Sequence, residues 1–240
     1  MNITTPKIEF TVCENKECAI PAVIVAAGSS WRMNGIDKQF LEVSGIPVIA
    51  RTLLAFERSS YISKIILVTR EQSVNRIQLI AEKYLISKLT DIVVGGDTRG
   101  QSVLCGINRL SSGEEKVLIS DGARPFVSER MISECVNSLK SHDGCLCAVK
   151  VKDTVKYVED GSVKKTVDRD RLYLAQTPQG VTVKIYKKAA ESLDVSKYTD
   201  DVSLLEAVGA DVGIVDGDIR NIKITTPEDA ELAAFFARGD

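Results

Sequence analysis

Along most of the chain, short apolar runs alternate with longer segments in which apolar residues recur at helical spacing. The short runs are nearly continuous, which is typical of strands buried on both faces of a sheet. They occupy residues 22–27, 64–69, 91–96, 116–121 and 144–151. Helical spacing occupies residues 47–57, 73–84, 99–110 and 128–139. This alternation predicts an α/β fold, with a mostly parallel, twisted sheet that helices cover on both faces and right-handed crossovers connect.

The pattern breaks after Val151. Residues 152–176 have no helical period, and their first half alternates polar and apolar residues around the turn sequence "EDG". Such a turn between alternating segments predicts a β-hairpin. Because both of its strands are rich in charged residues, we expect an arm that projects from the core.

Helical spacing returns after Pro178. It predicts helices over 181–192 and 200–208, separated by two expected strands, 211–216 and 221–225, from a closing helix. Thr226 can cap that last helix and Pro227 suits its first position. Residues 1–20 match no part of the strand–helix rhythm.

Composition excludes several classes of protein. The net charge of the 240-residue chain is −2, whereas a general nucleic-acid or membrane-surface binder usually carries a basic excess. The first residues lack the basic start and apolar core of a secretory signal. Six cysteines are too few for a disulfide scaffold in a chain of this length, and the single histidine, His142, argues against a mixed Cys/His zinc cluster. We therefore expect a cytoplasmic protein with reduced thiols.

A loop that carries two cations, "AAGSSWRMNGIDKQF" at residues 26–40, follows the first expected strand. Its small residues leave backbone N–H groups unhindered, and such a nest of donors suits phosphate oxygens. Arg32 and Lys38 add positive charge. The loop matches neither the P-loop nor the dinucleotide-binding pattern. Taken alone, a basic loop that contains glycine is more often a surface turn than a binding site.

Three further strand ends carry small residues next to charged ones. Gly96, Asp97 and Ser102 follow one expected strand, and Asp121, Gly122 and Arg124 follow another, while Lys223 lies on a late strand. The carboxyl ends of parallel strands share one edge of the sheet, where ligands bind. These side chains should therefore converge with the cation-bearing loop.

Six segments, in order and at matching spacing, resemble the 2-C-methyl-D-erythritol 4-phosphate cytidylyltransferase family. They are "AAGSSWRM…DKQF", "GGDTRGQSV", "DGARPF", "KDTVK", "TVDRDRLYLAQTPQ" and "RNIKITTPEDAELA", and the resemblance spans about residues 21–237. It implies a Rossmann-like nucleotidyltransferase domain over 21–240, with a β-arm inserted at about 152–176 that crosses over in a homodimer. Residues 1–20 would be an extension of unknown role.

The resemblance also implies a reaction: CMP passes from CTP to 2-C-methyl-D-erythritol 4-phosphate, which yields the CDP-linked alcohol and pyrophosphate, in non-mevalonate isoprenoid biosynthesis. Mg²⁺ or another divalent cation would be the cofactor. The attacking phosphate oxygen is already an anion, so no general base is needed. What is needed is positioning of the two anions and positive charge around the transferring phosphorus.

The resemblance assigns roles to single residues. It gives catalytic roles to Arg32 and Lys38. The residues implied to bind CTP are Ala26, Ala27, Gly28, Ser29, Gly96, Asp97, Ser102, Asp121 and Gly122. Those implied to hold the acceptor are Arg124, Thr154, Arg169, Thr177 and Lys223, with Thr154 and Arg169 reaching across the dimer. Asp121 would contact the metal, directly or through water. Arg99 receives no role, because a salt bridge to the neighbouring Asp97 would be enough to account for it.

Three positions depart from the family pattern. Gly122 replaces a usual alanine, Trp31 occupies a site that is often small or basic, and Asp37 stands where proline is usual. None of them removes a catalytic group. Two alternatives stay open: a ribitol-5-phosphate cytidylyltransferase, which shares the loop, the lysine and the arm, and a non-catalytic nucleotide sensor.

Overall fold

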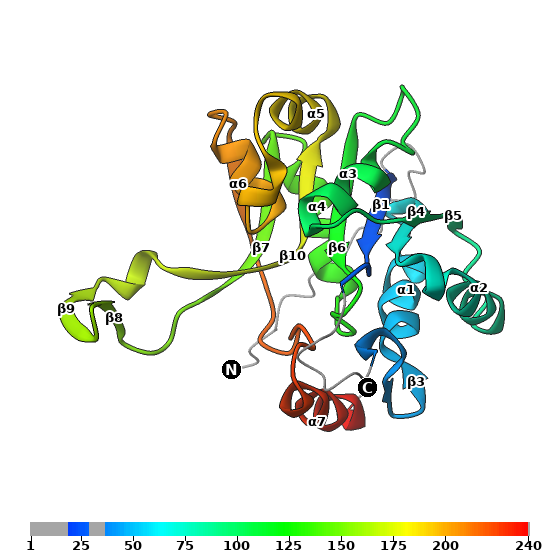
Figure 1. Ribbon diagram of the computed structural model, residues 1–240, viewed down its shortest axis with the longest axis horizontal. Helices are drawn as coiled ribbons and strands as arrows, with labels where there is room; N and C mark the ends of the chain where they lie inside the picture. Colours follow the sequence, from blue (N-terminus) through cyan, green and yellow to red (C-terminus); the bar gives the residue numbers. More distant parts are fainter. Residues whose placement is uncertain (1–18, 29–36, 240) are drawn as a thin grey trace, which may run out of the picture.

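The computed structural model describes residues 19–28 and 37–239, and its centre is a seven-stranded sheet (Figure 1). The strand order is β11-β7-β10-β6-β1-β4-β5. The strands are β1 (Ile20–Val25), β4 (Ile62–Thr69), β5 (Leu89–Val94), β6 (Lys116–Asp121), β7 (Gly144–Lys150), β10 (Tyr173–Thr182) and β11 (Val212–Asp216). β1 pairs in parallel with β4 and β6, as do β4 with β5 and β7 with β11. The predicted fold class, a mostly parallel sheet between helices, is confirmed.

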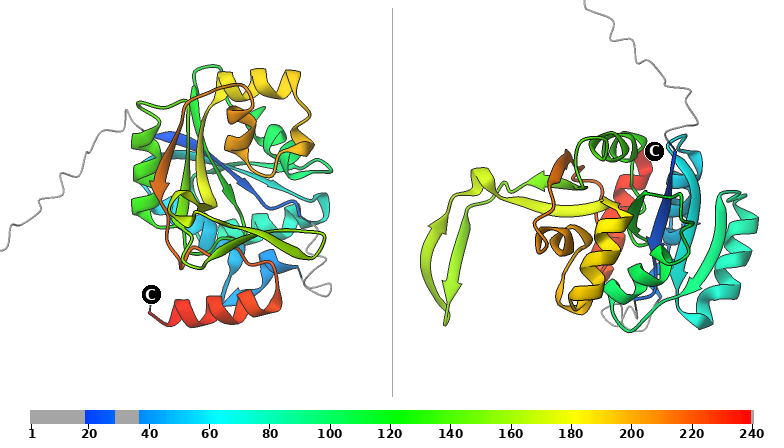
Figure 2. Two further views of the ribbon diagram at one scale, coloured as in Figure 1. Left: turned by 90° about the vertical axis from the view of Figure 1, so that its left-hand side faces the viewer. Right: turned by 90° about the horizontal axis from the view of Figure 1, so that it is seen from above.

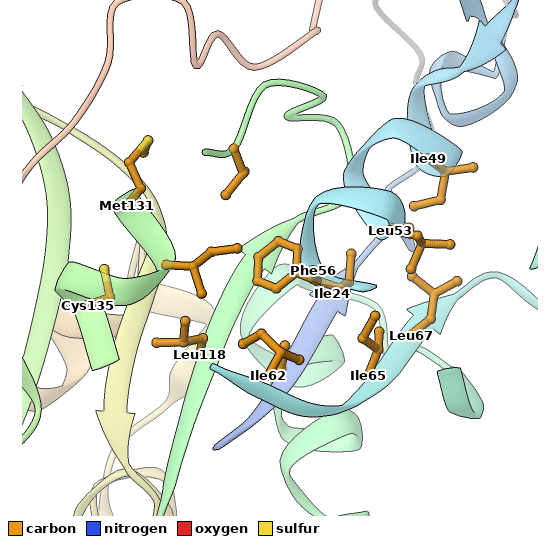
Figure 3. Packing of buried hydrophobic residues seen from close by; sticks show 14 of the residues in the cluster. Ile24, Ile49, Leu53, Phe56, Ile62, Ile65, Leu67, Leu118, Met131 and Cys135 are labelled. Carbon is orange, nitrogen blue, oxygen red and sulfur yellow. The ribbon is translucent and has the colours of Figure 1, made fainter. Parts of the chain in front are cut away.

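Helices cover both faces of this sheet. They are α1 (Val48–Arg58), α2 (Val74–Lys83), α3 (Arg99–Ile107), α4 (Glu129–Ser138), α5 (Val183–Ser192) and α6 (Asp201–Glu206). A further helix, α7 (Pro227–Phe236), packs instead in a separate cluster with Val43 and Val48. On one face, Ile24 of β1 packs in a buried cluster with Leu53 and Phe56 of α1 and Met131 of α4 (Figure 3). On the other face, Val23 packs with residues of α3, α5 and α6. Neighbouring β1 residues thus point to opposite layers, which explains why the strand is apolar throughout.

Within the central sheet, β10 is the strand that the sequence pattern did not reveal. It lies between β6 and β7 and runs antiparallel to both. Its middle contains three polar residues, Gln176, Thr177 and Gln179, and all three are buried. The Gln179 carboxamide oxygen accepts from the backbone N–H groups of Asp201 and Val202, at 2.9 and 3.1 Å. Because such hydrogen bonds satisfy buried polar groups, a central strand can contain polar residues. The strand then lacks the continuous apolar run by which a buried strand is predicted.

Residues 221–225, expected to form a strand, form none. Asn221 is buried, and its side-chain nitrogen donates to the Thr177 carbonyl at 2.8 Å, while the Ile224 N–H donates to the Ala123 carbonyl at 2.9 Å. These contacts to two different segments take the place of a ladder. The final helix does begin at Pro227, as predicted, and the Asp229 carboxylate accepts from the Thr226 N–H at 2.9 Å.

A predicted hairpin stands away from the body of the molecule (Figures 1 and 2). β8 (Val155–Glu159) and β9 (Ser162–Val167) pair antiparallel in a two-stranded sheet of their own. Asp160 and Gly161, from "EDG", have φ values of 50° and 71°, as a tight hairpin turn requires. A second, shorter hairpin, β2 (Glu42–Val43) with β3 (Ile46–Pro47), was not predicted. None of the helices in the described ranges is long and apolar enough to cross a membrane.

Candidate active site

The carboxyl ends of β1, β5 and β6 surround a cavity of about 360 Å³. Its lining comes from five separate stretches of chain: Val25, Ala27, Gly28, Lys38, Gln39, Gly96, Asp97, Thr98, Arg99, Ser102, Asp121, Ala123 and Lys223. A second cavity, of about 190 Å³, shares Arg99, Asp121 and Lys223 with the first and adds Arg124, Thr177 and Gln179. The structure therefore brings together side chains that the sequence analysis expected at one edge of the sheet.

Asp121 is the centre of the charged groups. The last residue of β6, it receives Lys223 Nζ at 2.9 Å, Arg99 Nε at 3.2 Å and Arg124 Nε at 3.4 Å. Burial by itself would raise the pKa of this carboxyl, but the charges of Arg99, Lys223 and Arg124 outweigh burial and hold the pKa well below its ordinary value. Asp121 is therefore ionised at neutral pH and orients three cations at once.

Arg99 lines the cavity, although the sequence analysis assigned it no role. Its ion-pair partners are Asp121 and Asp201 and not the neighbouring Asp97. Its Nη2 donates to Asp201 at 2.7 Å and its Nε to Asp121, so it bridges α6 and β6. Burial raises the pKa of the Asp201 carboxyl above its ordinary value. The charge of Arg99 opposes this effect without cancelling it, and the negative charges of Asp121 and Asp200 raise the pKa further. The partners are far apart in sequence, so no local signal could have revealed the pairing.

The start of α3 explains the glycines of "GGDTRGQS". Thr98 caps the helix, with its hydroxyl accepting from the Gln101 N–H at 3.2 Å and its own N–H donating to the Gln101 side chain at 3.1 Å. A Cβ on Gly95 would lie 2.7 Å from the Cβ of Ala27, and one on Gly96 would lie 2.6 Å from the Cβ of Gln101. Only glycines allow this turn to approach β1 and α3 so closely.

Ser102 is buried at this turn and lines the cavity, and its hydroxyl donates to the Thr98 carbonyl at 2.9 Å. The lone pairs of that oxygen can still accept a hydrogen bond from a ligand. Asp97 is exposed at the cavity rim. Both residues therefore lie where the sequence analysis placed them.

The expected phosphate nest is only partly available. Ala26 N–H donates to the Val68 carbonyl at 2.7 Å, and Gly122 N–H donates to the Val25 carbonyl at 2.8 Å. Both amides therefore serve the sheet, and neither residue lines the cavity, whereas Ala27, Gly28 and Lys38 do. Arg32 and Ser29, which were also assigned to this loop, lie outside the described residues.

The residues assigned to the acceptor fall into two groups. Arg124 and Thr177 are buried beside Asp121: Arg124 Nη1 donates to the Asn221 carbonyl at 2.6 Å, and Thr177 Oγ1 accepts from the Asp121 N–H at 3.0 Å. Thr154 and Arg169 are exposed, lie at the base of the hairpin, and line neither cavity. Arg169 instead donates to the Lys152 carbonyl at 2.5 Å.

The same residues determine how a divalent cation could be held. Within residues 19–28 and 37–239, no three His, Cys, Asp or Glu side chains lie close enough together to hold a metal ion. Asp121 offers one ionised carboxylate. This arrangement fits Mg²⁺, which commonly takes one or two carboxylates and completes its coordination with water and phosphate oxygens.

Three larger cavities lie elsewhere. One of about 530 Å³ is lined by parts of α1, Phe126 and Arg220, one of about 680 Å³ lies between α2 and β5, and one of about 490 Å³ lies beside α5. Of the predicted site residues that the structure describes, none lines any of the three. Chemistry therefore points to the smaller, charged cavity at the ends of the strands.

Comparison with known proteins gives a consistent result. Residues 20–238 match the family model described as 2-C-methyl-D-erythritol 4-phosphate cytidylyltransferase. Enzymes of that name from Geobacillus kaustophilus and Geobacter metallireducens are both 43% identical to the chain, over 88% and 92% of its length and 94% and 98% of theirs.

Solved structures agree. The 4-diphosphocytidyl-2C-methyl-D-erythritol synthase from Anaerococcus prevotii superimposes with a TM-score of 0.82 at 36% identity, covering 92% of this chain and 96% of that one. The family match and the close relatives both span most of the chain, from the first strand to the last helix. The chain therefore belongs to the 2-C-methyl-D-erythritol 4-phosphate cytidylyltransferase family.

Proposed function

We propose that this protein transfers CMP from CTP to 2-C-methyl-D-erythritol 4-phosphate and releases pyrophosphate, as a cytidylyltransferase of isoprenoid biosynthesis. The observation that carries the proposal is the group of cations, Arg99, Arg124 and Lys223, held around ionised Asp121 at the ends of parallel strands. Two anionic reactants can be brought together only where fixed positive charge offsets their repulsion.

CTP would occupy the cavity of about 360 Å³ at the carboxyl ends of β1, β5 and β6. Ala27, Gly28 and Lys38 line this cavity, and backbone N–H groups together with a lysine charge would suit the triphosphate. Gly96, Asp97 and Ser102 line it too and would suit the cytosine and ribose. Lys38, together with Arg32, would stabilise the charge that develops as the phosphate oxygen attacks the α-phosphorus and the bond to pyrophosphate breaks. Ala26, Gly122 and Ser29 would shape the loop around the phosphates.

The acceptor would occupy the adjoining cavity. Lys223 and Arg124 lie on the side of Asp121 where that cavity is lined by Thr177, and they offer two positive charges to the acceptor phosphate. Because Lys223 faces both cavities, it can contact both reactants. A divalent cation bound near Asp121 would supply further neutralisation of the triphosphate.

The hairpin would complete the site in a homodimer. Tyr157, Val158 and Val163 expose 48%, 53% and 63% of their surface on β8 and β9. An isolated two-stranded hairpin is marginal in water, and exposed apolar groups on it favour a partner surface. Thr154 and Arg169 at its base would then reach the acceptor bound to the other subunit. The expected location of the enzyme is the cytoplasm.

The test is a pyrophosphate-release assay with CTP, Mg²⁺ and each acceptor in turn. Rapid release with methylerythritol phosphate, and little with ribitol 5-phosphate or without an acceptor, is the expected result. Faster release with ribitol 5-phosphate would assign the chain to the sister reaction. Binding of CTP without turnover would make the protein a sensor.

Two variants show whether the loop cations act in this reaction. We expect Lys38→Ala and Arg32→Ala each to lower turnover by about 10²–10³-fold, as for removal of one well-placed donor to a developing charge. Circular dichroism checks that both variants stay folded. Turnover close to that of the wild type in either variant would remove that residue from the mechanism.

A further inference from the structure

We propose that Asp37 and Arg70 form a clamp that positions Lys38 at the α-phosphate. The inference rests on the proposed function, because it concerns how the catalytic lysine is held. Nothing in the family resemblance assigns a role to Arg70, and Asp37 is one of the positions at which this chain departs from the family pattern.

Lys38 begins a single 3-10 turn, Lys38–Phe40, which Asp37 caps. One carboxylate oxygen of Asp37 accepts from the Gln39 N–H at 3.2 Å, and its carbonyl accepts from the Phe40 N–H at 3.0 Å. The conformation of Asp37 therefore sets the direction in which the turn leaves the loop. Since Lys38 is the next residue, any rotation at Asp37 moves its side chain.

Arg70 holds the other carboxylate oxygen of Asp37, through its Nη2 group. Arg70 follows β4 directly, and the two preceding residues anchor the site: the Val68 carbonyl accepts from Ala26 N–H at 2.7 Å and the Thr69 carbonyl from Gly95 N–H at 2.8 Å. The Arg70 guanidinium thus extends from the end of β4, which also holds Ala26 and Gly95 through these two hydrogen bonds. The side chains of Asp37 and Arg70 are 22% and 24% exposed, so water screens the pair only in part.

The rest of the turn is also held in place by packing. Gln39 is 3% exposed, and Phe40 packs against the buried cluster beneath α1. The guanidinium carbon of Arg76, on α2, lies 3.9 Å from the centre of the Phe40 ring, a cation–π contact. Arg70 therefore holds the start of the turn and Arg76 its end, and Lys38, which begins the turn, lines the cavity.

The Asp37–Arg70 ion pair also affects the electrostatic field around Lys38. A carboxylate next to the catalytic lysine would attract the Lys38 ammonium group and reduce the positive field available to a phosphate. Arg70 occupies that carboxylate and adds a compensating charge. The other charged residues of this region are Glu71, which follows Arg70 and is exposed, and Arg76, which lies on α2 against the Phe40 ring.

A covalent restraint could replace the clamp. Asp37 has φ −75° and ψ 102°, values that proline adopts without strain. A proline here would stiffen the backbone without needing Arg70. The Asp37–Arg70 pair therefore does by charge what the proline usual at this position would do by its ring.

The first experiment compares Arg70→Met with Arg70→Lys. We expect Arg70→Met to lower kcat by about 10- to 100-fold with little change in KM for CTP, since a displacement of about 1 Å at a catalytic group costs this much. Arg70→Lys keeps a cation beside Asp37 and should recover most of kcat. Equal kcat values in the wild type and Arg70→Met would overturn the proposal.

Lys64→Met is the matched control. Lys64 pairs with Glu114 at 2.9 Å, with side chains 22% and 19% exposed, so the pair resembles Asp37–Arg70 in burial but does not line either site cavity. Urea unfolding should show similar losses of stability in Lys64→Met and Arg70→Met, and only the latter should lose kcat. If kcat falls equally in both, Arg70 acts through stability alone and the clamp is wrong.

The decisive comparison uses the Asp37→Pro variant as a second background. In the Asp37→Pro background, Arg70→Met should change kcat less than twofold, because the ring now restrains the turn. A full loss of kcat in the double variant would contradict the clamp. Failure of the underlying function would look different, since the wild type itself would then release no pyrophosphate.

Discussion

At the scale of single residues, the site depends on one carboxylate that serves three cations. Asp121 stays ionised although it is buried, because Arg99, Lys223 and Arg124 favour its charged form. The depressed pKa links this group to stability: its contribution is present above the pKa of the unfolded chain and is lost as the pH falls through the lower folded-state pKa.

We therefore predict that Asp121→Asn loses about 3 kcal/mol of unfolding free energy at pH 7, as expected when a buried ion pair loses one partner. The difference between variant and wild type should shrink as the pH falls below about 4, the region of the unfolded-state pKa. Urea unfolding from pH 7 to pH 3 measures it. Asp97→Asn, at an exposed acid of the same cavity, is the control and should follow the wild type. An Asp121→Asn protein as stable as the wild type at pH 7 would contradict this account.

The sequence allowed Asp121, Arg124 and Lys223 to be placed together, because each lies in or next to a strand-end motif. It did not reveal Arg99 bonded to Asp201, or Gln39 in the cavity wall. These contacts depend on where α6 and the 3-10 turn pack, which no local pattern encodes. Likewise, the sequence could not show that the backbone N–H groups of Ala26 and Gly122 donate to carbonyls of neighbouring strands, because these hydrogen bonds depend on how the strands pair.

At the scale of elements, periodicity predicted strands and helices whose buried residues are apolar, and it failed where burial is polar. β10 was missed because its centre reads "QTPQ", and the expected strand 221–225 is instead a loop tied down by Asn221. The hairpin was found because "EDG" encodes its turn directly. What the hairpin does is a separate question, since within one chain its base lies away from both cavities.

We predict that the hairpin acts on the partner subunit's site. Mixing Lys38→Ala and Arg169→Ala chains, each nearly inactive alone, should give mixed dimers in which one of two sites has both residues. Random pairing makes half of the dimers mixed, so about a quarter of wild-type activity should return, given two-fold symmetry. Refolding the chains together and assaying pyrophosphate release measures this. Mixtures no more active than either parent would place Arg169 outside the acceptor site or within its own chain's site.

At the scale of the whole molecule, the charge that matters is local. The chain as a whole is slightly acidic, at −2, yet Lys38, Arg99 and Lys223 face one cavity against Asp97 and Asp121. The sheet concentrates these groups at one edge, because β1, β5 and β6 all end there. The ligand-free protein therefore holds mutually repelling cations together, at a cost that an anionic ligand would relieve.

This balance predicts that CTP stabilises the whole fold and that its phosphates are responsible. At a concentration of about 100 times its dissociation constant, a ligand adds roughly 2.7 kcal/mol to the unfolding free energy. For a domain of this size that corresponds to a rise of about 5–10 °C in Tm. Thermal unfolding followed by circular dichroism should show this rise with CTP, and much less with cytidine at the same concentration.

Raising the salt concentration from about 0.15 M to 1 M should reduce the shift, because it screens partly exposed charges. Lys38→Ala should have nearly the wild-type Tm without ligand and a smaller rise with CTP. If cytidine raised Tm as much as CTP, recognition would reside in the base alone, and the cations at the strand ends would need another explanation.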